Sequence, residues 1–379
     1  MNRPRSAGRG RPLLYTSYAQ DIAMFNTPGK RWGVAALFAL ALLAPFAFND
    51  DVVLILALAL VAAIGAIGLN LVTGYAGQVS LGHAFFLGIG TYAGAVLGGD
   101  PEATRALAFG LPMVVWIPGA GLVAALAGLI VGPLATRLRG LYLAIVTLGL
   151  VFLGGHLFKE ARFITGGIGA GRRGAALDFF GYRFDQAGPL LGLDLTRAQK
   201  QYVLALVLLS IFAVLGRNLA RSGVGRAFSA IRDRDIAAEV IGVGLTKYKV
   251  LAFTISSFYA GVAGAVFYSI AGVVEPTAFN LLLSVQYIAM ILIGGVATIS
   301  GSIMGAIFIM TLARVTQEIA HYIPYISTQA IGGGLINVFQ LEAILYGLLI
   351  IGFLIFEPRG LFGIWFRTRN YWKGWPFSY

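Results

Sequence analysis

The sequence predicts an all-α fold, a polytopic bundle of transmembrane helices. Of its 379 residues, 58% are hydrophobic and only 12% are charged, which is about half the charged fraction of a typical soluble domain. Apolar runs long enough to cross a bilayer recur along the whole chain. A helix lets such a run satisfy its backbone hydrogen bonds within lipid, so we expect these runs to be helical spans.

The composition also excludes several kinds of site. There is no cysteine, which rules out disulfides, thiolate metal sites and cysteine nucleophiles. The three histidines, His83, His156 and His321, are scattered and lack metal-ligand spacing. The net charge of +12 is expected to come from basic cytoplasmic loops beside anionic lipid, and not from a nucleic-acid site.

About ten apolar segments are expected to span the membrane, with eight as the lower count. The first is expected to be an uncleaved span, although Pro45 interrupts its end. A glycine-rich stretch separates the eighth and ninth, so these two are alternatively one broken or re-entrant element. Together the segments form a membrane domain over residues 33–356. They are 33–48, 52–72, 79–98, 113–135, 141–157, 201–216, 248–272, 281–293, 296–313 and 341–356.

Polar stretches flank and interrupt this domain. Residues 1–32 are basic and are expected to form a disordered cytoplasmic tail. Residues 357–379 interleave basic and aromatic side chains, a pattern typical of a membrane-surface anchor. The longest loop, 158–200, contains GAGRRG, which is only a weak phosphate-binding signal because the P-loop pattern and a preceding strand are missing.

The distribution of positive charge predicts the orientation of the chain. Ten spans put both termini on one side, and that side also includes 217–249. It carries about two thirds of the 28 lysine and arginine residues. The positive-inside rule therefore predicts that both termini and 217–249 are cytoplasmic, and that the loop 158–200 is extracytoplasmic.

A polar stretch interrupts the apolar region between residues 70 and 83. Irregular backbone at membrane depth is tolerated only where protein buries it or water reaches it. Transporters place such broken helices at their substrate sites, so one interpretation is that this stretch lines a path. The other is a tight helical hairpin at the membrane surface. The candidate path residues are Asn70, Thr73, Gly74, Tyr75, Gly77, Gln78, Ser80 and His83.

The long charge-dense segment with spans close on both sides is 221–244. Val224, Phe228 and Ile231 recur in it at helical spacing, which predicts a short amphipathic helix. Two short helices between spans would form a compact projection that another protein can bind. The alternative is an ordinary solvated loop.

The second of these short helices is expected to follow the first directly. Asp233 or Asp235 is expected to cap its N-terminus. Gly242 and Gly244 are expected to end it, because glycine adopts the left-handed conformation that terminates helices.

The expected spans contain no Asp, Glu, Lys or Arg far from an end. Ion-coupled carriers need such groups, which disfavours a stand-alone carrier, and a passive channel would not need a charged cytoplasmic helix pair. The chain has no P-loop consensus, so ATP would have to bind to a partner. An intramembrane enzyme is disfavoured too, because its nearest candidates are only His83 with Ser80 and His156 with Lys159 and Glu160.

Six collinear blocks carry a resemblance to one family. They are GLNLVTGYAGQVSLGHAFFLGIGTYAG (68–94), RGLYLAIVTLG (139–149), FITGG (163–167), GRAFSAIRDRDIAAEVIGV (225–243), FNLLLSVQYIAMILIGGVATISGSIMGA (279–306) and EPRGLFGIW (357–365). In these blocks the chain is similar to permease subunits of branched-chain amino-acid ABC importers, and most to the M-type (LivM-type) subunit. IGAGRRG after the third block departs from the PNG-like turn of that family, and residues 1–32 have no counterpart.

This resemblance implies a heteromeric importer in the bacterial plasma (inner) membrane. A sister permease subunit would pair with this chain, two ATPase subunits would hold ATP and Mg²⁺, and an extracytoplasmic substrate-binding protein would dock outside. The chain itself would bind no cofactor and would not be an enzyme. The cargo would be Leu, Ile or Val, with urea, short amides or other amino acids as alternatives.

The same resemblance makes 221–244 the coupling helix, the counterpart of the EAA loop of ABC importer permeases. Ile231 and Ile236 are then expected to enter a groove of the ATPase, with the charged pair between them at its rim. The expected coupling residues are Arg226, Ile231, Arg232, Asp233, Ile236, Ala237, Ala238, Glu239 and Gly242.

Overall fold

The computed structural model describes residues 28–102, 106–138, 140–167, 169, 171–190, 192–320, 326–327 and 336–374. The chain divides into two compact units, Met1–Ala47 and Phe48–Tyr379. In the first unit the described part is one helix, α2 (Pro28–Ala47), which continues two residues past Pro45. The predicted tail 1–32 is therefore corrected: residues 28–32 are helical, and 1–27 lie outside the described residues.

The second unit is built from long apolar helices. Nine of the ten apolar segments expected from the sequence overlap a helix of this unit, and the first overlaps α2, because an apolar run satisfies its backbone hydrogen bonds by forming a helix. The long helices after α2 are α3 (Asp50–Asn70), α4 (His83–Gly98), α5 (Met113–Arg137), α6 (Leu141–Glu160), α8 (Arg197–Arg221), α11 (Leu245–Ala271), α12 (Leu281–Gly294), α13 (Ile299–Ala320), α14 (Val338–Phe356) and α15 (Gly360–Gly374).

Short elements connect the long helices. Four pairs of two- or three-residue strands occur in the described residues, antiparallel except for the parallel pair β7–β8. The short helices are the π-helix η1 (Leu71–Tyr75), α7 (Arg162–Thr165), α9 (Gly223–Asp233), α10 (Asp235–Val240) and the 3₁₀-helix η2 (Pro276–Ala278). The strands are β1 (Arg172–Arg173) with β6 (Val273–Val274), β2 (Asp178–Phe179) with β3 (Tyr182–Arg183), β4 (Gly188–Leu190) with β5 (Leu193–Leu195), and β7 (Ile326–Ser327) with β8 (Ile336–Asn337).

Helix length alone supports fewer membrane spans than the sequence predicts. In the described residues six helices are long and apolar enough to cross a bilayer, and the bent pair α14–α15 would make a seventh. Three further apolar helices, Arg31–Ala47, His83–Gly98 and Leu281–Gly294, have 10–17 residues. The chain is thus a polytopic helical membrane protein, while a count of about ten spans stays a prediction.

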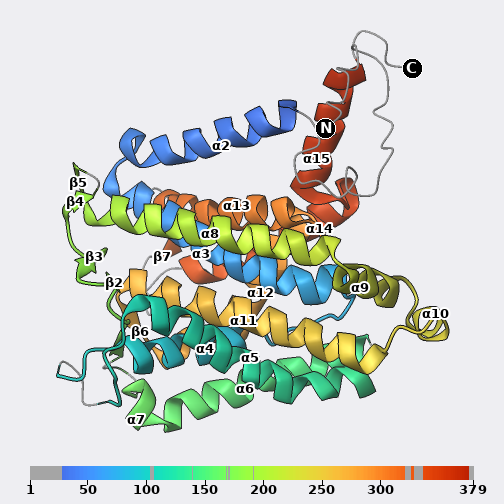
Figure 1. The fold of residues 1–379 in the computed structure, drawn as a ribbon, viewed down its shortest axis with the longest axis horizontal. Helices are drawn as coiled ribbons and strands as arrows, with labels where there is room; N and C mark the ends of the chain where they lie inside the picture. The colour runs from blue at the N-terminus through green and yellow to red at the C-terminus, as the bar shows by residue number, and fades with distance from the viewer. Residues whose placement is uncertain are drawn as a thin grey trace, which may run out of the picture. The chain divides into compact units, whose positions relative to one another are not determined.

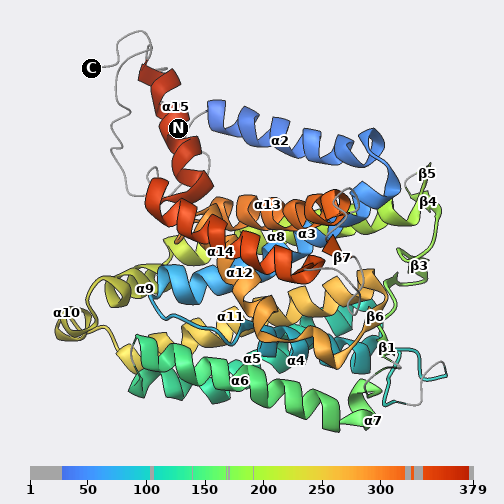
Figure 2. The ribbon, with the colours of Figure 1, turned by 180° about the vertical axis from the view of Figure 1, so that it is seen from behind.

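The core of the second unit forms around α3 and α11. Every residue of α3 from Ala59 to Asn70 is buried, and α11 packs against α3, α4 and α5 (Figures 1 and 2). Glycines allow this close packing: a Cβ added to Gly90 of α4 would lie 2.1 Å from the Cα of Gly261 in α11. Such contacts between small residues are typical of helix pairs in membranes.

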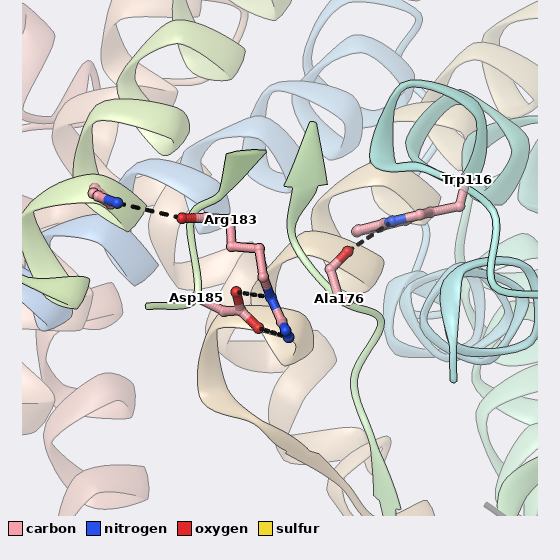
Figure 3. A network of polar contacts seen from close by, with 5 residues as sticks. Trp116, Ala176, Arg183 and Asp185 are labelled. Atoms are coloured by element: carbon pink, nitrogen blue, oxygen red, sulfur yellow. Dashed lines mark hydrogen bonds and ion pairs between the residues drawn. The ribbon is translucent and has the colours of Figure 1, made fainter. Parts of the chain in front are cut away.

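The loop 158–200 forms the strands β1–β5 and is tied to the helices. The indole N–H of Trp116 donates to the Ala176 carbonyl at 3.1 Å, and Arg183 pairs with Asp185 at 3.0 Å (Figure 3). The Asp185 carboxylate raises the pKa of Arg183 because it stabilises the charged guanidinium. Arg172, from the GAGRRG stretch, is buried and donates to the carbonyls of three other residues, so the weak phosphate-binding interpretation loses this arginine. Those carbonyls belong to Ala95, Leu107 and Ile164.

The two ends of the second unit carry different structures. In both views α9 and α10 lie at one end of the helices and the hairpins β2–β3 and β4–β5 at the other (Figures 1 and 2). The predicted surface anchor at 357–379 is a helix from Gly360 onward, and Glu357 pairs with Arg367 at 2.6 Å. Residues 375–379 lie outside the described residues.

Candidate functional site

The polar stretch between α3 and α4 is a helix break. The helix α3 passes at Asn70 into the π-turn η1, residues 76–82 are non-helical, and α4 starts at His83. π-turns of this kind are frequent at functional sites. The expected span 79–98 is corrected at its start, because 79–82 belong to the break. Gly77 has φ +69°, a conformation that favours glycine.

Asn70 joins this break to a second one, the turn 295–298 between α12 and α13. Its side chain is fully buried, and its amide nitrogen donates to the Thr298 carbonyl at 2.9 Å and to Ser302 Oγ at 2.7 Å. Its oxygen accepts from the Ala297 N–H at 2.8 Å. The protein thus uses both polar atoms of Asn70. For this residue the packed interpretation describes the structure, and its predicted place along a path is corrected.

Hydroxyl groups hold the rest of the break in place. Thr73 Oγ1 donates to the Gln78 carbonyl at 3.1 Å, and Ser80 Oγ accepts from the Gly82 N–H at 3.3 Å. Thr147 of α6 accepts from the Leu81 N–H at 2.9 Å. Sequence reasoning missed three hydroxyl partners of the break, and the signal for them was a small hydroxyl residue within an apolar run. They are Thr147, Ser284 and Ser302.

Gln78 and His83 differ from the other polar residues of the break. Both are buried, with 5% and 2% of their surface exposed. Within the described residues, Gln78 Oε1, Gln78 Nε2 and His83 Nε2 have no hydrogen-bond partner. The His83 ring packs against Tyr287, with 4.8 Å between ring centroids. Because an unpaired buried polar group is costly, these atoms are the ones left for water or a ligand.

Tyr287 also lines a small cavity. Its volume of about 30 Å³ is room for one water molecule and not for an amino acid. Its lining is mostly apolar and comes from α3, α4, α11, α12 and α13: Ala62, Leu87, Gly264, Phe267, Tyr268, Leu283, Gln286, Tyr287, Met290 and Met310.

The first short helix of the charged segment, α9, is amphipathic as predicted. Ser222 caps it by accepting from the N–H groups of Val224 and Gly225. Phe228 is fully buried and Ile231 is 6% exposed. The expected insertion of Ile231 into a partner groove is therefore corrected, because the chain's own packing already occupies this side chain.

The second short helix, α10, ends as predicted but starts differently. The N-cap is Arg234 and neither aspartate; Asp235 lies in the first turn and pairs with Lys249 of α11 at 3.9 Å. At the other end Gly242 has φ +88°, and its N–H donates to the Glu239 carbonyl at 3.0 Å. This is the expected glycine termination.

The outer face of α10 carries an apolar patch made of Ile236, Val240 and Ile241. These side chains are 66%, 83% and 75% exposed. Ala237 and Glu239 are exposed beside them, whereas Ala238 is buried against the chain. We call Ile236, Val240 and Ile241 the α10 patch.

Arg232 lies where the charged segment meets the helix break. Its Nη1 donates to the Gly74 carbonyl at 3.2 Å, and its Nε pairs with Asp233 at 3.2 Å. A Cβ on Gly77 would come within 2.8 Å of Arg232 Cγ. Part of the Arg232 guanidinium thus binds this chain, and its position at the rim of a partner groove stays a prediction. Arg226 is exposed and its Nη1 donates to the Arg221 carbonyl.

Comparison with known proteins agrees with this architecture. Residues 52–354 match the family model described as "Branched-chain amino acid transport system / permease component". The chain is 30% identical over 356 residues to the "High-affinity branched-chain amino acid transport system permease protein LivM" of Escherichia coli (strain K12), covering 89% of this chain and 76% of that protein. LivM of Salmonella typhimurium gives the same identity and coverage.

More distant relatives match shorter parts of the chain. The "Fructose import permease protein FrcC" of Rhizobium meliloti is 28% identical over 52% of this chain and 52% of its own length. The "Autoinducer 2 import system permease protein LsrC" of Enterobacter sp. (strain 638) is 32% identical over 38% of this chain and 44% of its own length. No solved structure matches. The match over residues 52–354 and the similarity to LivM over 89% of the chain show that the chain belongs to the family of permease components of branched-chain amino acid transport systems.

Proposed function

We propose that this permease and a sister permease together form the path by which an ATP-driven importer carries Leu, Ile or Val across the inner membrane. Two ATPase subunits, which hold ATP and Mg²⁺, and an extracytoplasmic binding protein complete the assembly. Family membership supports the transport role, since the relatives are permeases and not enzymes. The α10 patch is the observation that carries the proposed coupling to an ATPase.

The α10 patch has the character of a docking surface. Two large aliphatic side chains of the six-residue helix, Ile236 and Val240, and that of the C-cap residue Ile241 are exposed. On the inner side, Ala238 is buried and Asp235 pairs with Lys249, so the chain holds α10 in place. Contiguous exposed apolar groups of this kind mark protein–protein contacts. Because the chain has no P-loop of its own, an ATPase subunit is the partner that a driven permease requires.

The proposed orientation places α9, α10 and both termini in the cytoplasm. The excess of lysine and arginine on that side supports it. The arrangement of the helices supports it as well, since α9 and α10 lie at the end opposite the hairpins of the loop 158–200 (Figures 1 and 2).

The proposed path runs past Gln78 and His83. Their side-chain atoms without a partner can bind a passing polar group, and Val79 beside them is 44% exposed and apolar. Leu, Ile and Val each have charged amino and carboxylate groups and an apolar side chain, so this combination of polar and apolar groups suits them. Thr73, Gly74, Tyr75, Gly77 and Ser80 would shape the backbone around the path.

The docking proposal is tested by changing Ile236 to Asp. An unpaired charge in a desolvated contact weakens association by about 2–5 kcal/mol. We expect the variant to insert in the membrane, to lose its ATPase subunits on purification and to lose ATP-driven uptake. Ile236→Leu keeps the apolar surface and is the matched control, so it should retain both. If Ile236→Asp binds its ATPase subunits as well as the unaltered chain does, α10 is not part of the interface.

A second class of cargo is motivated by one departure from the family pattern. IGAGRRG replaces the turn expected after FITGG. We keep urea, short amides or other amino acids as the alternative cargo. Competition of each against labelled leucine uptake separates the two classes.

A further inference from the structure

Arg232 ties the end of α9 directly to the first helix break. Its Nη1 donates to the Gly74 carbonyl at 3.2 Å, which lies in η1, where carbonyl groups at a helix end lack partners from their own helix. The backbone also approaches closely, because a Cβ on Gly77 would lie 2.9 Å from Arg232 Cα. Any displacement of the last turn of α9 must therefore act on residues 74–77.

The first break is tied in turn to the second. A Cβ on Gly74 would lie 1.9 Å from Asn70 Oδ1 and 2.6 Å from the Ala297 nitrogen. Asn70 binds Ala297 and Thr298 of the turn 295–298 through its amide. The phenol of Tyr75 interacts with the backbone of Ile299 at the start of α13. The contacts thus run without a gap from α9 through η1 to α13.

Both linked segments have backbone that can rearrange locally. One contains a π-turn followed by Gly77 at φ +69°, and the other contains Gly295 at φ +131° and Ala297 at φ +57°. Hinges are commonly a few residues at the ends of elements, where large dihedral changes are absorbed. A rigid link between two such segments makes them change together.

We propose that Arg232 is a positioning residue that passes the movement of α9 and α10 to both helix breaks, so that 71–82 and 295–298 change conformation together. This inference rests on the proposed coupling to an ATPase and adds the route inside this chain. Arg232 acts inward, through Gly74 and Asn70, and the α10 patch acts outward. The movement reaches Gln78 and His83, because they lie within or directly after the first break.

The test measures the conformation of the second break, the turn 295–298, in variants of Arg232 at the end of α9. Val296 lies in that break and is 39% exposed, and the chain has no cysteine, so Val296→Cys gives a single thiol. The complex purified through this chain is reconstituted in liposomes, and the rate of thiol modification is measured without nucleotide and with ATP plus vanadate. With Arg232 present, we expect the two rates to differ.

Arg232→Ala is expected to abolish this difference while the ATPase subunits still co-purify and still hydrolyse ATP. Arg232→Lys keeps an N–H donor for the Gly74 carbonyl and should restore part of the difference. Arg234→Ala removes the same charge from an exposed side chain two residues along, so it should keep the difference. A role in stability alone would lower the unfolding temperature of Arg232→Ala and leave the difference between the two rates.

An undiminished difference in Arg232→Ala overturns the inference and leaves the docking proposal intact. If no ATPase subunits co-purify with the unaltered chain, by contrast, the docking proposal itself is overturned. Should Arg232→Ala not accumulate in the membrane, Arg232→Gln takes its place: loss of the difference supports the route, and an intact difference contradicts it.

Discussion

Polar residues of the same type have different roles in this protein according to their partners. Asn70 and Gln78 both carry an amide, both lie in the break and both are buried. The chain uses both polar atoms of Asn70, and neither side-chain atom of Gln78 has a partner in the described residues. The sequence predicted a polar break but not this division, because the partners of Asn70 lie more than 220 residues away.

Replacing each amide separates the two roles. Asn70→Ala leaves the part-buried Ala297 N–H unpaired, which costs about 1–3 kcal/mol, and takes one of its donors from the Thr298 carbonyl, which still accepts from Ser302. Gln78→Ala removes an amide without a partner and should leave stability nearly unchanged, while uptake per folded complex falls. Thermal unfolding in detergent and uptake normalised to folded protein check both. Equal loss of thermal stability in the two variants would show that Gln78 is structural.

At the scale of helices and strands, the sequence predicted what apolar periodicity determines. The ten apolar segments and the buried stripe of α9 follow from it. The predicted N-cap of α10 was wrong, because Arg234 takes the extended conformation of the cap and Asp235 is the first residue of the helix. The third span was predicted to start too early, at residue 79, because Val79 and Leu81 continue the apolar run. The hairpins at 178–195 were missed, since two- and three-residue strands give no alternating pattern.

The proposed placement of α9 and α10 on the opposite side of the membrane from the hairpins can be checked by thiol labelling. Lys247 lies in the first turn of α11, which follows α10, Asp194 lies in β5, and both are exposed. An impermeant thiol reagent added to whole cells, with any outer barrier permeabilised, should label Asp194→Cys and spare Lys247→Cys. Cell lysis should expose both, which controls for reactivity. The reverse pattern would place α10 outside, away from any ATPase.

At the scale of the whole molecule, one packed core supports two linked breaks. α3 and α11 pack through small residues, and the breaks at 71–82 and 295–298 meet at Asn70. The sequence predicted the first break from its polar residues and offered the second as an alternative for its glycine-rich stretch, but the contact between them depends on the packing of α3 against α13, which periodicity does not report. The segment 221–244 was singled out by its charge, whereas the inward contact of Arg232 came from the fold.

The central claim is that this chain is the permease of an ATP-driven importer of branched-chain amino acids. The most direct measurement is uptake of labelled leucine by liposomes that hold the complex purified through this chain, with its binding protein supplied on the opposite side from ATP. We predict uptake that requires ATP hydrolysis, that unlabelled Ile and Val suppress, and that urea does not affect. Leucine entry at the same rate without ATP, or uptake that urea suppresses and Ile and Val do not, would contradict the account.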